Sequence, residues 1–223
     1  MTGFIACCAK NVGFAFLFFV SGVAFSGSYE DFFNAIRQDN SSKVSELLVR
    51  GFDANTLDPK GQTGLYLAMR EPSPQTFQVL LDWPKTDVNK LNIQGESILM
   101  LAVIKGDLEV ANKLIKKGAD VNKTNWTPLH YAASGGQAEL IGLLLENSAY
   151  IDAESPNGST PLMMAAMYGS EDSVKLLLQE GADPKLKNEQ GLTALDFAHR
   201  GKRPDSVEAI AKAIRSKQPA GRW

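Results

Sequence analysis

The sequence predicts an all-α solenoid in which about six helix-turn-helix units stack side by side. A Thr or Ser recurs at positions 63, 97, 127, 160 and 193, at spacings of 34, 30, 33 and 33 residues. A Leu follows two residues after each of them, and an Ala follows three residues after each Leu. Self-similarity at a fixed period of this length is the signature of a repeat architecture, in which each unit buries its apolar face against its neighbours.

The repeated positions predict two helices in each unit. Thr127 can accept hydrogen bonds from the first free amides of a helix, and Pro128 is tolerated at the first helical position. Leu129 and Ala132 are three residues apart and share one helix face. Second helices are expected where apolar residues recur at helical spacing, over residues 109–115 and 173–178. Glycines should separate the helices of a pair at positions 106, 136 and 169, and end the second helices in a left-handed conformation at positions 51, 118 and 181.

The period divides the chain into units of unequal regularity. We predict an N-terminal capping unit, four full repeats, a C-terminal capping unit and a tail, over residues 27–60, 61–94, 95–124, 125–157, 158–190, 191–217 and 218–223. The first unit has helical segments at 32–36 and 44–48 without the entering Thr-Pro, and the last has a more polar second helix over 206–214. Three residues are missing between Asn122 and Trp126, so the turn there should be shortened.

The best-preserved segments resemble the ankyrin repeat. Residues 127–133 read Thr-Pro-Leu-His-Tyr-Ala-Ala, which contains the Thr-Pro-Leu-His-x-Ala string of that family, and residues 118–122 read Gly-Ala-Asp-Val-Asn, the family's repeat ending. The resemblance extends from Tyr29 to Lys217. It implies stacked helix pairs with projecting β-turn fingers, and it implies that His130 is a structural hydrogen-bonding residue.

The first 26 residues are predicted to be a signal peptide. Lys10 precedes an apolar run over 12–20, and small residues follow, with Ala24 and Ser26 in a small-x-small pattern. The run is shorter than the ~20 residues that a membrane-spanning helix needs. The alternatives are an uncleaved signal anchor that continues to Ser28, and a buried helix.

Export would place the mature chain in the periplasm or outside the cell, whereas an uncleaved anchor would tether it to a membrane. We expect no stable membrane insertion after cleavage. A signal peptide on an isolated array resembles the exported, periplasmic ankyrin-repeat proteins of bacteria. Cleavage after Ser26 removes Lys10, Cys7 and Cys8, so the mature chain would fold without disulfides.

Composition argues against several classes of function. The chain has 23 Lys and Arg against 25 Asp and Glu, so it lacks the basic footprint of a nucleic-acid-binding protein. The two cysteines are adjacent and only two histidines occur, which leaves no metal-ligand spacing. Neither a Gly-x-Ser-x-Gly elbow nor a Gly-x-x-x-x-Gly-Lys loop is present. We therefore expect no catalytic residues, no metal site and no cofactor, and we predict that the chain is not an enzyme.

A partner-binding surface is predicted on the concave face, formed in this family by the turn tips and the outer ends of the first helices. Apolar side chains fall there on neighbouring central repeats, as interface hot spots do. The residues predicted to bind a partner are Arg70, Ile104, Lys105, Trp126, Ser134, Met167, Tyr168 and Arg200. The alternative for Trp126 is that it folds over the shortened turn and only packs.

The predicted function is non-catalytic protein–protein recognition by a monomer, through the concave face. One alternative is a narrower role as an inhibitor or immunity-type partner of an exported enzyme. Another is a small-molecule binder or a hydrolase on the same scaffold, which a closed apolar pocket with converging acidic side chains would support.

Overall fold

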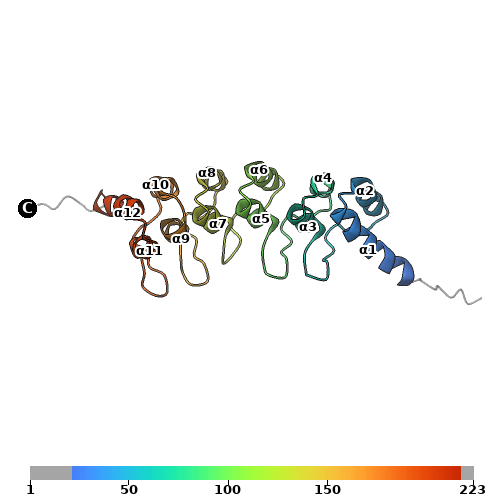
Figure 1. Ribbon diagram of the computed structural model, residues 1–223, viewed down its shortest axis with the longest axis horizontal. Helices are drawn as coiled ribbons and strands as arrows, with labels where there is room; N and C mark the ends of the chain where they lie inside the picture. The colour runs from blue at the N-terminus through green and yellow to red at the C-terminus, as the bar shows by residue number, and fades with distance from the viewer. Residues whose placement is uncertain (1–21, 217–223) are drawn as a thin grey trace, which may run out of the picture.

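The computed structural model describes residues 22–216, and this part of the chain is an elongated stack of helix pairs (Figure 1). One layer holds the first helix of each pair: α1 (Gly22–Arg37), α3 (Gly64–Arg70), α5 (Ile98–Ile104), α7 (Pro128–Ser134), α9 (Pro161–Tyr168) and α11 (Ala194–Arg200). The other layer holds the second helices: α2 (Ser41–Val49), α4 (Pro74–Asp82), α6 (Leu108–Lys116), α8 (Ala138–Glu146), α10 (Glu171–Gln179) and α12 (Pro204–Ser216). The predicted all-α solenoid is confirmed.

Each of the six units delimited in the sequence contains one helix pair, but the ends differ from expectation. The helix α1 begins at Gly22, five residues before the expected start of the mature chain at Gly27. The helix α12 is longer than the predicted 206–214 segment. The remainder of the predicted signal peptide, residues 1–21, and the tail at 218–223 lie outside the described residues.

The recurring Thr or Ser explains where the first helices begin. The side chain at positions 63, 97, 127, 160 and 193 accepts a hydrogen bond from the backbone N–H three residues later. In four of these helices a second hydrogen bond runs the other way. The side chain three residues after the capping residue accepts a bond from the backbone N–H of the capping residue, and these side chains are Met100, His130, Met163 and Asp196. Each helix start therefore satisfies donors that would otherwise lack partners.

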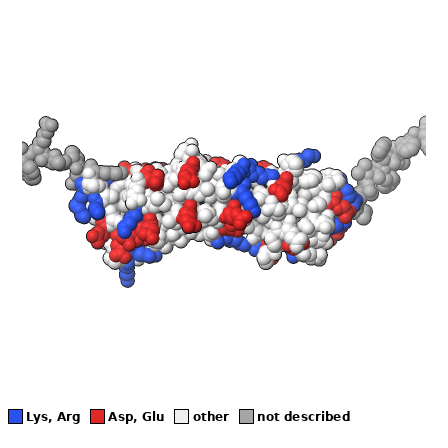
Figure 2. Space-filling model, turned by 90° about the horizontal axis from the view of Figure 1, so that it is seen from above, with Lys and Arg blue, Asp and Glu red and all other residues white. Residues whose placement is uncertain are grey.

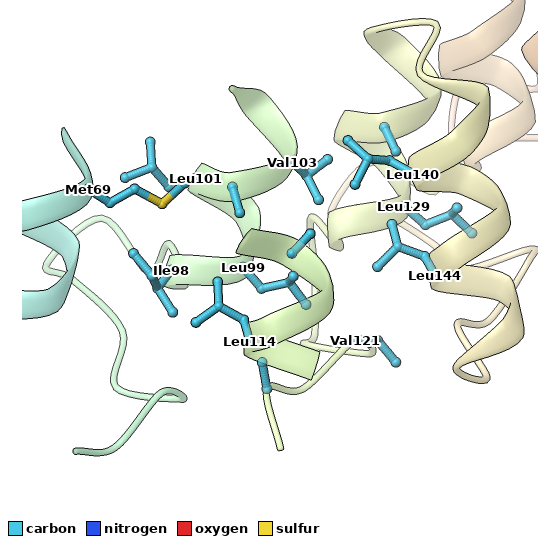
Figure 3. Packing of buried hydrophobic residues seen from close by; sticks show 14 of the residues in the cluster. Met69, Ile98, Leu99, Leu101, Val103, Leu114, Val121, Leu129, Leu140 and Leu144 are labelled. Atoms are coloured by element: carbon cyan, nitrogen blue, oxygen red, sulfur yellow. The ribbon is translucent and has the colours of Figure 1, made fainter. Parts of the chain in front are cut away.

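The recurring Leu and Ala form the core between the layers. Figure 3 shows Leu99 beside Leu114, and Leu129 beside Leu144, each pair joining a first helix to the second helix that follows it. All four side chains are completely buried. At Gly169 a side chain would meet the carbonyl oxygen of Ala133 on the neighbouring repeat, so the small residue permits a close approach of backbones. The glycines at 51, 118 and 181 have φ values of 96°, 91° and 107°, which confirms the left-handed helix ends.

Polar side chains link the loops that follow the second helices. The amide of Asn122 donates to the carbonyl of Ser148 and accepts from the N–H of Tyr150, at 2.8 and 2.7 Å. Asn55 and Asn89 make the same pair of bonds to the next repeat. Asp152 occupies the corresponding position in the following unit and accepts from the N–H of Asp183. We call these four residues the loop ladder, and it joins five successive units.

Candidate functional site

The ends of the first helices bring most of the predicted binding residues into one row. Successive first helices pack side by side, and their last residues therefore recur once per repeat along the array. We call this row the helix-end strip; it consists of Arg70, Ile104, Lys105, Ser134, Met167, Tyr168 and Arg200. Trp126 is the one predicted binding residue outside the strip, and it lies just before α7.

Apolar side chains of the strip lie on the central helices α5 and α9, and basic side chains lie at the ends of α3 and α11 and directly after α5. Ile104 and Tyr168 are 50% and 56% exposed. Arg70 contacts Glu71 at 2.8 Å, and the Lys105 ammonium donates to the carbonyl of Met69 at the end of α3. Arg200 is exposed at the end of α11. Exposed apolar residues among charged ones on one edge are typical of a protein-binding surface.

The β-turns that precede the first helices are joined to one another by backbone hydrogen bonds, and this series of bonds is interrupted in the middle of the array. Four long turns are each closed by a backbone bond: Asp58 to Gln62, Asn92 to Glu96, Ser155 to Ser159, and Asn188 to Leu192. Neighbouring long turns are joined by the N–H of Ile93 donating to Gly61 and that of Glu189 donating to Asn157, at 3.0 and 3.1 Å. Among the described backbone bonds, none joins the short turn at 123–126 to either neighbour.

The sequence is consistent with this break. Pro156 occupies, in its turn, the place that Ile93 and Glu189 occupy in theirs. A proline has no N–H to donate. The turn that would accept that bond is the shortened one, so the array has two separate groups of paired turns with a gap at 123–126.

Trp126 borders this gap. Its ring lies edge-on to the ring of His130, with centroids 5.4 Å apart and planes at 76°, and 6.3 Å from the ring of Tyr131. The side chain is half-buried. Trp126 therefore packs against α7, and part of its side chain also remains exposed to solvent.

A pocket of about 220 Å³ lies next to Trp126, between α7 and α9. Trp126, His130, Tyr131, Ser134 and Met164 line it. Two of the predicted binding residues, Trp126 and Ser134, thus share one pocket. Ile104, Met167 and Tyr168 do not line it.

Sequence reasoning missed Tyr131 and Met164. Each lies three residues before a residue of the strip, Ser134 and Met167 respectively, and so shares its helix face. Both side chains are half-buried, unlike the fully buried Leu and Ala positions of the same helices. The three-residue spacing was a signal that could have identified them.

His130 has a structural role in this arrangement. Its Nδ1 lies 3.2 Å from the N–H of Thr127 and its Nε2 lies 2.9 Å from the carbonyl oxygen of Ser159, on the next repeat. Burial lowers the pKa of the ring, against a smaller upward effect of the hydrogen bond to Ser159. A neutral imidazole with a donor at Nε2 and an acceptor at Nδ1 satisfies both bonds. Neither nitrogen is available to act as a base.

A second polar cluster adjoins the same region. The hydroxyl of Tyr66 donates to Glu96 at 2.7 Å, and the amide of Asn92 donates to the same carboxylate oxygen at 2.7 Å. Burial, with that carboxylate, raises the pKa of Tyr66 to about 12. Burial also raises the pKa of Tyr131, and the negative charge of Glu96 adds to the effect. These groups fix the turn at 92–96, on the N-terminal side of the gap.

Between residues 22 and 216, no group of three or more His, Cys, Asp or Glu is arranged to hold a metal ion. Over that range, too, no helix has the length and apolar character needed to cross a membrane.

Proteins of known structure share this architecture. A solved ankyrin repeat domain from Acinetobacter baumannii superposes with a TM-score of 0.73 over 82% of this chain and 97% of that one, at 24% identity, which shows the fold alone. The ankyrin repeat domain of Bcl-3 superposes with a TM-score of 0.70 over 81% of each chain, at 28% identity.

Curated relatives resemble parts of the chain. The putative palmitoyltransferase ZDHHC13 of Danio rerio is 37% identical over 133 residues, which cover 56% of this chain and 20% of that protein. The probable 26S proteasome regulatory subunit p28 of Saccharomyces cerevisiae is 42% identical over 91 residues, covering 39% of this chain and 40% of that one. This chain therefore spans less than half the length of these two relatives.

The family comparison covers nearly all of the described residues. The model described as "Ankyrin repeats (3 copies)" matches residues 32–125, 73–155 and 129–218. The capped helix pairs, the β-turns between them and these matches together lead to one assignment: the chain belongs to the ankyrin repeat family.

Proposed function

We propose that this protein is a non-catalytic protein–protein interaction module that binds its partner through the helix-end strip and the adjoining Trp126 pocket. Ankyrin repeats are a protein-interaction module, which supports the general role. The observation that carries the location is the half-exposure of Ile104 at the end of α5 and Tyr168 at the end of α9, in the same strip as the basic residues and near the pocket between α7 and α9. Apolar anchors within a polar surround are the usual composition of binding hot spots.

Two double variants test this proposal. Each of them replaces two exposed apolar side chains. Ile104→Ser with Tyr168→Ala changes the strip, whereas Val49→Ser with Tyr150→Ala changes side chains that are 76% and 69% exposed, at the end of α2 and in the loop after α8. Tagged wild type and both variants are compared in pull-downs from the cells that make the protein. A partner lost only from the strip variant supports the proposal. A partner held equally by both variants would place binding elsewhere.

We further propose that the protein acts as a monomer in the periplasm or outside the cell, like the exported ankyrin-repeat proteins that it resembles. The support is the basic, apolar and small-residue order of its first 26 residues. Fractionation followed by intact-mass measurement tests the location and the cleavage after Ser26. An uncleaved chain in the membrane fraction would indicate a signal anchor, and light scattering would give the oligomeric state.

The alternative functions receive less support. The pocket of about 220 Å³ is smaller than the ~300–1,000 Å³ of typical small-molecule sites. Both ring nitrogens of His130 are already engaged, which argues against a hydrolase there. Inhibition of an exported enzyme is a narrower form of the proposed role, and loss of the captured enzyme's activity on mixing would identify it.

A further inference from the structure

We propose that the helix-end strip binds an extended acidic segment of the partner, with one large apolar side chain seated in the Trp126 pocket. This inference rests on the proposed function and adds to it the chemistry of the partner. It follows from three features of the surface: the nature of the pocket, the sign of the charges along the strip, and the spacing between them.

The pocket suits a single apolar side chain. Four of its five lining residues carry rings or a thioether, Trp126, His130, Tyr131 and Met164, and the fifth is Ser134. The Ser134 hydroxyl donates to the carbonyl of Tyr131 within its own helix. The pocket therefore offers few polar groups to a ligand and gains most by removing apolar surface from water.

The pocket is held in shape before any partner arrives. Trp126 rests on His130, and the bond from His130 to Ser159 ties α7 to the next repeat. The helices α7 and α9, which form its two sides, have the most extensive contact of any helix pair described. A preformed pocket spares the ordering cost that weakens binding.

The charges along the strip favour a negatively charged segment. The strip and the two residues that follow each of its five helices contain four basic side chains, Arg70, Lys105, Arg200 and Lys202, and one acidic side chain, Glu71. Glu71 is paired with Arg70. The Lys105 ammonium has three donors and uses one on Met69, so it can also bind a carboxylate. The face of the second helices differs, because both signs are interspersed there (Figure 2).

The spacing of these charges predicts where the acidic residues fall. The pocket lies between α7 and α9, Lys105 follows α5, and Arg200 ends α11. Packed helices are ~8–10 Å apart, so each basic group lies roughly 15 Å from the pocket. An extended chain advances about 3.3–3.6 Å per residue, and the acidic residues are thus expected about four or five positions before and after the apolar anchor.

Peptide selection tests this directly. A library of random 15-residue peptides displayed on phage is selected on the protein as purified from cells. We expect enriched peptides to share one large apolar residue with Asp or Glu about four or five positions away on both sides. The affinity of a synthetic selected peptide is then measured by fluorescence anisotropy at two salt concentrations, because an electrostatic contribution weakens as salt is added.

Matched variants locate the peptide on the surface. Ser134→Phe fills the pocket and Arg200→Glu reverses a charge of the strip. We expect each to weaken binding about tenfold or more, the size of a hot-spot loss. Ser42→Phe and Arg215→Glu make the same changes on exposed positions of α2 and α12, and should leave affinity unchanged. Circular dichroism checks the fold, and the exposed Arg200 variant keeps the test valid if Ser134→Phe does not fold.

The outcomes separate this inference from the proposed function. Selected peptides without acidic residues, or peptides whose affinity Ser134→Phe and Arg200→Glu leave unchanged, would overturn the inference. An empty selection beside a pull-down that still depends on Ile104 and Tyr168 would also overturn it, and would leave the proposed interaction role intact. An empty selection together with a pull-down that captures nothing would remove both.

Discussion

The ring of Trp126 lies edge-on to the ring of His130, with their centroids 5.4 Å apart. The tryptophan borders the pocket, and the histidine is buried and bonded to the carbonyl of Ser159 in the next repeat. A wall of the candidate binding pocket therefore rests directly on a contact between repeats. Changes to that contact should affect both the stability and the binding surface.

The two aromatic residues of the predicted site should differ in their effect on folding. Trp126→Ala removes a half-buried ring and an aromatic pair worth about 0.5–1.5 kcal/mol, so we expect a loss of about 1–3 kcal/mol. Tyr168→Ala changes an exposed side chain and should stay within ~0.5 kcal/mol. Urea unfolding followed by circular dichroism measures both. Equal losses would show that the packing of Trp126 on α7 does not stabilise the array.

Stability should fall on mild acidification because of His130. Burial lowers its pKa in the folded chain below the unfolded value of about 6.5, so the unfolded chain takes up the proton first. The contribution of neutral His130 to the free energy of unfolding is complete above pH 6.5. It decreases as the pH falls through 6.5 toward the pKa of the folded chain. Melting temperatures at pH 7.5, 6.5 and 5.5 should drop in wild type. His130→Gln should flatten this pH dependence of the melting temperature. His199→Gln, at an exposed histidine, is the control and should keep it. A flat profile in the His199 variant would contradict the assignment of the effect to His130.

Two glycines should respond in opposite directions to alanine. Gly142 lies inside α8 and a side chain there would meet nothing within 4 Å, so Gly142→Ala should stabilise by about 0.5–1 kcal/mol. At Gly169 a side chain would meet the backbone of Ala133 and Ala165, and Gly169→Ala should destabilise by about 1–3 kcal/mol. Chemical unfolding of both variants decides. A neutral Gly169→Ala would mean that the repeats do not approach so closely.

The loop ladder should make a measurable contribution to stability. Asn122→Ala removes two bonds, to Ser148 and from Tyr150, and at about 0.5–1.5 kcal/mol each the loss should be roughly 1–3 kcal/mol. Asn147→Ala is the matched control, because its amide makes one local bond within its own helix end. Thermal unfolding compares the two. A larger loss in the control would contradict the role of the ladder.

The repeat period was sufficient to predict the helix pairs and the capping residue at the start of five first helices. Thr127 and its counterparts cap the first helices through contacts with residues three positions away, and such local contacts are visible in a sequence. The start of α1 was not predicted, because its residues before Gly27 were assigned to a signal peptide. That assignment stays a prediction.

The candidate site was predicted only in part. The positions of the strip follow from the period alone, and the shortened turn was visible as three missing residues. The pocket was not predicted, because it depends on how far Trp126 leans onto α7 and on the distance between Tyr131 and Met164 in adjacent repeats. The pocket depends on side chains that meet at one place in the array, and the repeat period does not specify such a contact.

The short turn has a mechanical consequence for the whole array. The loop ladder continues past it through Asn122, whereas the bonds between neighbouring turns stop on both sides of it. The side-chain bonds between repeats are thus continuous along these loops, whereas the backbone bonds between the turn tips are interrupted in the middle of the array. The two groups of paired turns are therefore not joined by a backbone bond at residues 123–126, and bending that spreads the turns apart would separate the groups there. Such bending would tilt one group of turns against the other, while the packed helices α7 and α9 keep the candidate pocket in shape.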